Sequence, residues 1–113
     1  MRIEISKFVD KKWGYEVIFV NNDLYCGKLF ILKKGAICSY HYHPIKTETF
    51  VVYKGKVGLT VNGEEFTLVP SSEAITIEPG DKHSFYGIAR SEMFEFSSHH
   101  SDEDVVRESE SSG

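Results

Sequence analysis

The sequence predicts an all-β domain, and three observations point to that fold class. Apolar and polar side chains alternate along several short segments, a pattern that is typical of strands. Residues that favour turns separate these segments at short intervals. No window of about eleven residues shows a convincing helical stripe of apolar side chains, apart from a weak one near the C-terminus. Many short strands at regular spacing predict a sandwich or a barrel.

The clearest pair of strands lies in residues 56–69. Alternate residues from Val57 to Val61 are apolar, as are alternate residues in the segment 64–69. Between them, Asn62-Gly63 supplies a two-residue turn of the kind that needs positive φ. The two segments therefore predict a β-hairpin. The same criteria predict further strands at residues 15–20, 27–33, 37–42, 47–54, 74–77, 83–89 and 93–98.

The strand predicted at residues 47–54 is apolar on both faces. Phe50 and Val52 share the face of Glu48, while Val51 and Tyr53 take the opposite face. A strand that is apolar on both sides needs cover on both sides. One face can line a barrel, and the other is expected to meet a second sheet or a second subunit, which suggests a homodimer.

The length of 113 residues predicts a single domain. We assign residues 1–98 to this domain and expect residues 99–113, an acidic and Ser-rich tail, to be partly disordered.

The net charge is −4 and the lysines are scattered, which argues against binding to nucleic acid. The apolar runs are too short to span a membrane, and the N-terminus has no signal-peptide pattern, so we expect a cytoplasmic protein. Cys26 and Cys38 are expected to be free and buried.

One short segment and a distant histidine form a candidate metal site. His41 and His43 are two residues apart, so they project from the same face of a strand. Pro44 ends that strand, and Glu48 on the returning strand can face the same point. Pro79-Gly80 makes a turn that delivers His83 to the start of another strand. The simpler alternative is a half-exposed polar face with a solvated glutamate.

Three imidazoles and a carboxylate suit a borderline divalent ion, namely Zn, Mn, Fe, Co or Ni. They would leave coordination positions open for water or substrate, as catalytic sites do. Neither cysteine belongs to a CxxC pair, so a cysteine metal site is not supported.

The same residues carry a resemblance to the cupin superfamily. The segment 35–55 reads glycine, five residues, histidine, one residue, histidine, four residues, glutamate, six residues, glycine, and it matches the first cupin signature at each position. Gly80 and His83 match part of the second signature. Glu78 stands where that signature usually has proline, and Gly87 stands where it usually has asparagine.

The cupin resemblance implies a fold and a site. The implied fold is a double-stranded β-helix, or jelly-roll barrel, of two packed antiparallel sheets, and it is often dimeric. The implied metal ligands are His41, His43, Glu48 and His83, the four residues that the strand geometry already favours.

A narrower resemblance involves sugar-phosphate enzymes. Residues 11–35 look like the opening of the cupin domain of type II phosphomannose isomerase, which is often fused to mannose-1-phosphate guanylyltransferase. The match rests on Trp13-Gly14-Tyr15-Glu16, and residues 101–107 look like the end of that domain. That family tends to have glutamine where His41 stands. The chain therefore resembles a stand-alone sugar cupin.

These observations lead to a functional hypothesis with two alternatives. The first is a metal-dependent isomerase or epimerase that acts on a sugar or sugar phosphate through an enediolate, with Glu48 as the general base. Lys46, Lys82 and Tyr86 lie near the ligands in sequence and are candidates for substrate binding. The alternatives are a dioxygenase-type cupin, which an apolar pocket would favour, and a non-catalytic sugar-binding module, which a closed or dry pocket would favour.

Overall fold

A computed structural model describes residues 1–113 and contains strands but no helix, which confirms the all-β prediction. The strands are β1 (Lys7–Lys11), β2 (Gly14–Asn21), β3 (Cys26–Leu32), β4 (His41–Tyr42), β5 (Glu48–Lys54), β6 (Val57–Val61), β7 (Glu64–Leu68), β8 (Ile75–Ile77), β9 (His83–Gly87), β10 (Ser91–Ser97) and β11 (Val106–Arg107). The chain has no helix with the length and hydrophobicity that a membrane span requires.

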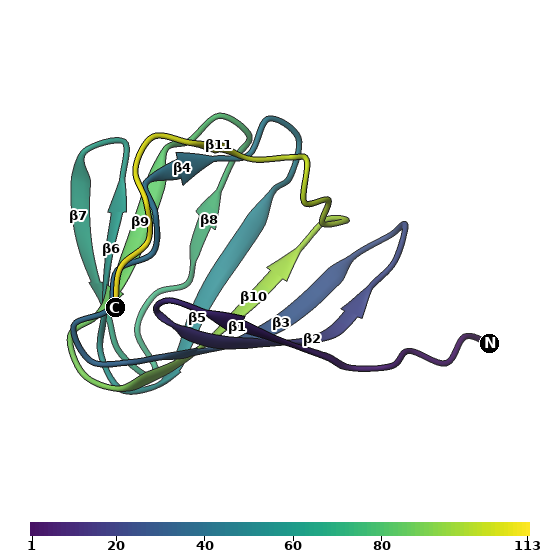
Figure 1. The fold of residues 1–113 in the computed structure, drawn as a ribbon, viewed down its shortest axis with the longest axis horizontal. Helices are drawn as coiled ribbons and strands as arrows, with labels where there is room; N and C mark the ends of the chain where they lie inside the picture. The colour runs from purple at the N-terminus through teal and green to yellow at the C-terminus, as the bar shows by residue number, and fades with distance from the viewer.

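The strands form two antiparallel sheets that lie against each other as two layers (Figure 1). One sheet has six strands in the order β1-β2-β3-β10-β5-β8, and the other has five in the order β11-β4-β9-β6-β7. Neighbours in each sheet are mostly distant in sequence, as with β10 between β3 and β5. This arrangement is the jelly roll that the sequence predicts.

The predicted hairpin is confirmed by the pairing of β6 with β7. Val57 faces Leu68 across the pair, and Val61 faces Glu64. Asn62 and Gly63 have φ values of 49° and 82°, the positive values that a tight two-residue turn of this kind needs.

Aromatic side chains from both sheets meet in the apolar core. Phe30 and Phe50 come from the six-stranded sheet and Phe85 from β9 of the five-stranded sheet, and Trp13 lies between β1 and β2. Their ring centroids are 5.2 to 6.2 Å apart. The ring centroid of Phe50 also lies 6.0 Å from that of His83. The apolar core therefore adjoins the candidate site and excludes water from one side of it.

The segment before His41 differs from the predicted strand at residues 37–42. Only His41 and Tyr42 form a strand, β4, and Ile37 makes isolated β-bridges to Tyr86 and Ser112. Because the chain is not continuously extended here, Ile37 is exposed and Cys38 is buried, the reverse of the strand alternation. Both cysteines are free and buried, as predicted.

Two strands were not predicted from the sequence. β1 is an edge strand that pairs only with β2, and most of its residues are exposed. Its sequence therefore lacks the buried apolar face by which the other strands were predicted. β11 lies within residues 99–113 and pairs with β4. The C-terminal segment runs across the five-stranded sheet beside β4 in Figure 1. The partial disorder expected of these residues in solution stays a prediction.

Candidate metal centre

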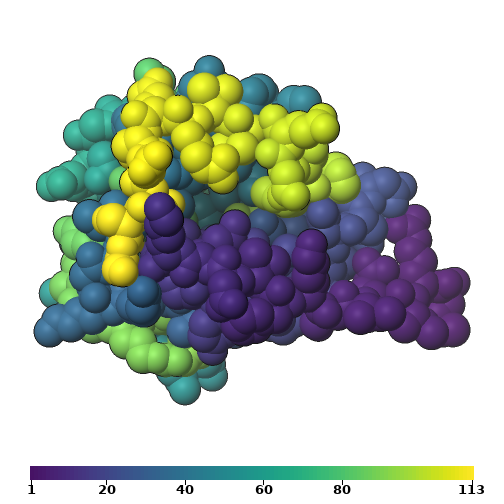
Figure 2. All heavy atoms as spheres, in the orientation of Figure 1, coloured from purple at the N-terminus to yellow at the C-terminus, as the bar shows by residue number.

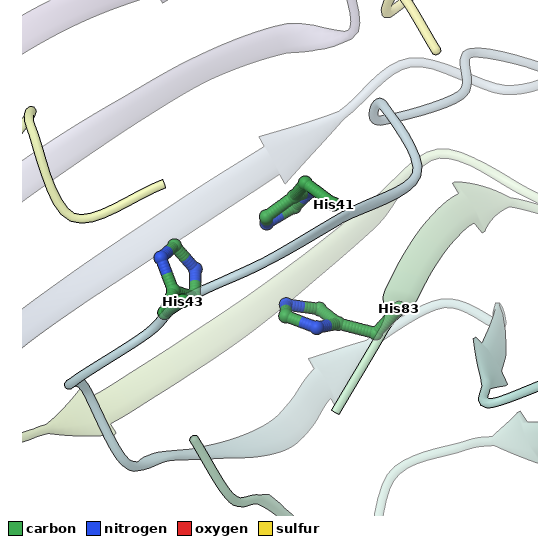
Figure 3. A group of neighbouring side chains, drawn as sticks. All are labelled: His41, His43 and His83. Carbon is green, nitrogen blue, oxygen red and sulfur yellow. The ribbon is translucent and has the colours of Figure 1, made fainter. Parts of the chain in front are cut away.

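Two strands bring the three histidines together. His41 on β4 and His83 on β9 are direct cross-strand partners, with ring centroids 4.4 Å apart. His43 follows β4 by one residue, and its ring lies 4.9 Å from that of His41. Figure 3 shows the three rings pointing toward one common space. Their potential ligand nitrogens lie within 4.8 Å of one another, and all three residues are buried.

Backbone carbonyl groups fix the orientation of each ring. The Nδ1 atoms lie at hydrogen-bond distance from the carbonyl oxygens of three residues, Ser39 for His41 (2.7 Å), Asp104 for His43 (2.7 Å) and Asp81 for His83 (2.9 Å). A carbonyl oxygen only accepts hydrogen bonds, so each Nδ1 carries the proton and donates it. The Nε2 atoms are then left with a free lone pair, as metal-binding histidines require.

Glu48 at the start of β5 completes the cluster. Its Oε2 atom lies 3.0 Å from Nε2 of His43 and 3.4 Å from Nε2 of His83. Burial opposes the charge on Glu48, whereas the Lys46 ammonium, 3.8 Å from Oε1, favours it. The carboxylate is therefore ionised and directed at the same point as the imidazoles.

Two atoms of this cluster are buried without a hydrogen-bond partner, Oε2 of Glu48 and Nε2 of His83. Both are acceptors when the Nδ1 atoms hold the protons, so they cannot satisfy each other. An unsatisfied buried polar group typically costs about 1–3 kcal/mol, and native proteins rarely leave one without a ligand or ion. A cation between these acceptors would satisfy both.

The protonation states also suit a metal. Burial, followed by the neighbouring His83, lowers the pKa of His41 to about 3, so its imidazole is neutral at physiological pH. Burial raises the pKa of the nearby Cys38 thiol to about 12, so no thiolate competes as a ligand. Three imidazoles and one carboxylate fit a borderline divalent ion.

A buried lysine supports Glu48 from the side. The Nζ atom of Lys46 lies 3.8 Å from Oε1 of Glu48 and donates to Oε2 of Glu95 at 3.2 Å and to Nδ1 of His100 at 3.1 Å. Burial alone would lower the pKa of Lys46, but the carboxylates of Glu95 and Glu48 raise it, so the ammonium remains charged. Burial and the charge of Glu48 raise the pKa of Glu95.

The structure places the other predicted site residues outside this cluster. Lys82 is half-exposed and forms a 2.8 Å ion pair with Glu108. Tyr86 on β9 points to the face opposite that of His83, and its ring covers Gly58. Neither residue lines the cavity that contains the histidines, whereas Lys46 does.

Three residues of the site were not predicted from the sequence: Glu95, His100 and Asp104. Glu95 carried little signal, because it shares the inward face of β10 with two serines and only one apolar residue, Met93. His100 and Asp104 reach the site only through the path of the C-terminal segment, and their local sequence is that of a polar tail.

The cluster opens into a cavity of about 650 Å³ between the two sheets. Figure 2 shows its opening as a hollow between the C-terminal segment, in yellow, and the N-terminal strands, in purple. Eight of the 25 lining residues are hydrophobic. Polar and charged residues are therefore the majority of the lining residues, and the cavity is open to solvent, which suits a hydrophilic small molecule.

Sugar isomerases are among the known proteins with sequences similar to this chain. The chain is 36% identical over 118 residues to the D-lyxose/D-mannose isomerase of Thermosediminibacter oceani, an alignment that covers 80% of this chain and 65% of that protein. It is 36% identical over 97 residues to the D-lyxose ketol-isomerase of Cohnella laeviribosi, covering 63% of this chain and 53% of that protein. The chain thus spans less than two thirds of either relative. The narrower resemblance to type II phosphomannose isomerase stays a prediction.

A solved structure and a family model agree on the fold. The capsular polysaccharide assembling protein CapF from Staphylococcus aureus superimposes with a TM-score of 0.78 at 19% identity, over 90% of this chain and 34% of that chain. The family model described as a cupin domain matches residues 28–101, which contain all four residues of the cluster. The chain therefore belongs to the cupin domain family.

Proposed function

We propose that this chain binds a divalent transition metal ion through His41, His43, Glu48 and His83 and interconverts an aldose and a ketose. The convergence of these donors carries the proposal, because it leaves two buried acceptors unsatisfied inside an open polar cavity. The ion would be Zn, Mn, Fe, Co or Ni, since each accepts imidazole and carboxylate ligands.

The character of the cavity supports a sugar as the substrate. Charged side chains from both sheets line it, and hydrophobic residues are in the minority. An apolar pocket would have favoured a dioxygenase, and a closed one would have favoured a non-catalytic module. Two relatives with similar sequences are named as isomerases of D-lyxose, so aldoses of this kind are the first substrates to test.

The residues of the cluster suit the proton transfer that this reaction requires. A bound divalent ion would supply positive charge beside the enediolate that forms when the aldose loses a proton. Glu48 accepts the proton from carbon 2 of the aldose and returns it to carbon 1, while the proton of the 2-hydroxyl passes to the oxygen on carbon 1. Lys46, held by Glu95, keeps the carboxylate of Glu48 in place during the transfer.

The activity is tested with metal-loaded protein and D-lyxose, D-mannose or mannose 6-phosphate. Formation of the ketose in D₂O, with deuterium at carbon 1 detected by NMR, is the expected result. Glu48→Gln should abolish the exchange, while Glu65→Gln, on the exposed face of β7, should retain it. An absence of both ketose and deuterium exchange for every aldose and metal would refute the proposed reaction.

The proposal includes a homodimer formed by the outer face of the six-stranded sheet. Tyr53, Phe94 and Phe96 stack there, with ring centroids 5.8 Å apart in each neighbouring pair. Tyr53 and Phe96 are 56% and 55% exposed in the single chain. A second copy of the chain that packs on this face would bury these rings.

A further inference from the structure

A second buried polar cluster lies in the same cavity, apart from the four proposed metal ligands. Glu16 on β2 and Lys28 on β3 are 6% and 3% exposed, and both line the cavity. Lys11 at the end of β1 lies beside them. None of these residues takes part in the proposed proton transfer.

The alternation of the strands places this cluster on the inner face of the six-stranded sheet. Lys28 is two residues from Phe30 of the core, and Glu16 is the direct cross-strand partner of Phe30. Lys28 is in turn the cross-strand partner of Glu95 on β10. Two charged side chains therefore occupy positions where apolar residues would complete the core.

The charged groups of this cluster make no direct hydrogen bonds with one another. Oε2 of Glu16 lies 3.7 Å from Nζ of Lys28, and Oε1 lies 3.8 Å from Nζ of Lys11. Both separations exceed the normal range for a hydrogen bond. The ammonium can donate three hydrogen bonds and the carboxylate can accept several, and buried charges normally use that capacity. The unused capacity faces the cavity.

We propose that Glu16 and Lys28 form a subsite for hydroxyl groups at the end of the sugar remote from the reacting carbons. This inference rests on the proposed function, because it assumes that the reacting end lies at the histidine cluster. A hydroxyl group both donates and accepts, so it can satisfy the carboxylate and the ammonium together. A phosphate dianion at the same end of the sugar has no donor for Glu16, so it cannot satisfy the carboxylate and the ammonium together.

The spacing of the strands suits this division of the sugar. Glu48 lies on β5 and Lys28 on β3, with β10 between them. Two strand spacings amount to about 9.5 Å, and a two-residue offset along the strands adds about 7 Å at right angles, so the two backbone positions are about 12 Å apart. A five- or six-carbon sugar that reaches from one group to the other would use both ends of its chain.

The test measures binding rather than turnover. Trp13, the single tryptophan of the chain, lines the cavity, so its fluorescence reports on a bound ligand. Metal-loaded wild type, Lys28→Met and Glu16→Gln are titrated with D-mannose, its 4-deoxy and 6-deoxy forms, and mannose 6-phosphate. Lys56→Met and Glu65→Gln, at exposed positions that do not line the cavity, serve as matched controls.

We expect Lys28→Met to weaken the binding of D-mannose about 10-fold or more, because a hydrogen bond to a charged group is lost. The wild type should bind at least one deoxy sugar more weakly than D-mannose, by a similar factor. Lys28→Met should bind that deoxy sugar and D-mannose with equal affinity. Mannose 6-phosphate should bind the wild type more weakly than D-mannose. The comparison of D-mannose with its deoxy forms uses only the wild type, so it tests the subsite even if Glu16→Gln fails to fold.

Two further results separate this inference from the proposed function. Two results would overturn the subsite while the wild type still isomerises the sugar, which leaves the function intact. One is that Lys28→Met and Glu16→Gln bind D-mannose as tightly as the wild type does. The other is that the wild type binds D-mannose and both deoxy forms equally well. Sugar binding that shows the expected losses without isomerisation would support the subsite and refute the reaction. Failure of the wild type to bind any of these sugars would overturn both.

Discussion

His43 and Asp104 are 61 residues apart, yet Nδ1 of His43 donates a 2.7 Å hydrogen bond to the carbonyl oxygen of Asp104. The carboxylate of Asp104 also accepts hydrogen bonds from the backbone N–H groups of Ile45 and Lys46, each at 2.9 Å. The C-terminal segment therefore fixes both the orientation of one proposed ligand and the turn that connects it to Glu48.

Asp104→Ala should weaken metal binding about 10-fold to 100-fold, because it removes the groups that hold the turn between two ligands. Competition with a chromophoric chelator measures this affinity. Glu103→Ala, at the exposed neighbouring position, is the control and should bind metal like the wild type. Equal affinities for Asp104→Ala and Glu103→Ala would show that the C-terminal segment does not support the centre.

His100 should make stability depend on pH. Burial, followed by the charges of Lys28 and Lys46, lowers the pKa of His100 from 6.5 to about 4. Between these two values the unfolded chain binds more protons at this residue than the folded chain, so the free energy of unfolding falls as the pH decreases from 6.5 to 4. We expect this residue to contribute a loss on the order of 2 kcal/mol across that range, given its partial exposure.

His100→Gln keeps an acceptor for Lys46 but does not titrate. Urea unfolding of the two proteins at several pH values between 4 and 7 compares their dependence on pH. The variant should lose less stability than the wild type over this range. Parallel curves for the two proteins would contradict the assigned role of His100.

Gly55 and Gly63 provide a matched pair for the steric limits of the fold. Both have positive φ, at 89° and 82°. A methyl group at Gly55 would lie 2.4 Å from the carbonyl oxygen of Arg90, whereas nothing lies within 4 Å at Gly63. Gly63→Ala should cost about 1–2 kcal/mol for its backbone conformation, and Gly55→Ala about 1–3 kcal/mol in addition. Equal free energies of unfolding would contradict this difference.

Phe96→Lys tests the proposed dimer. A charged side chain at one end of this row of rings would be costly to bury against a second copy of the chain. Light scattering coupled to gel filtration should give the mass of a dimer for the wild type and of a monomer for Phe96→Lys. A monomeric wild type at all concentrations tested would rule out the dimer, and a dimeric variant would place it on another face.

The sequence predicts the fold class and the grouping of the histidines well, because both depend largely on local patterns. Strand alternation reveals β5, β6 and β7, where one face is consistently buried. The cluster was also predictable, since His41 and His43 share a face and the turn at Pro44 returns Glu48 beside them. His83 reaches the cluster through the pairing of β9 with β4 in one sheet. Glu48 lies on β5 of the other sheet, so its position depends on how the two sheets pack.

The remaining parts of the site depend on contacts between distant segments, which no local pattern records. His100 and Asp104 lie in a polar segment whose position is set by its hydrogen bonds to the rest of the chain. Proximity in sequence also misleads at Lys82 and Tyr86. Lys82 pairs with Glu108 outside the cavity, and Tyr86 has the opposite strand parity to His83.

The metal content of the purified protein tests the central claim most directly. After loading with Mn, Zn, Ni, Co or Fe and removal of the free ion, elemental analysis of the wild type should give about one ion per chain. His41→Ala and His83→Ala should lose the ion, while His99→Ala, which alters an exposed histidine outside the cavity, should keep it. A wild type that takes up none of these ions, or a His83→Ala variant that retains the full amount, would contradict the assignment.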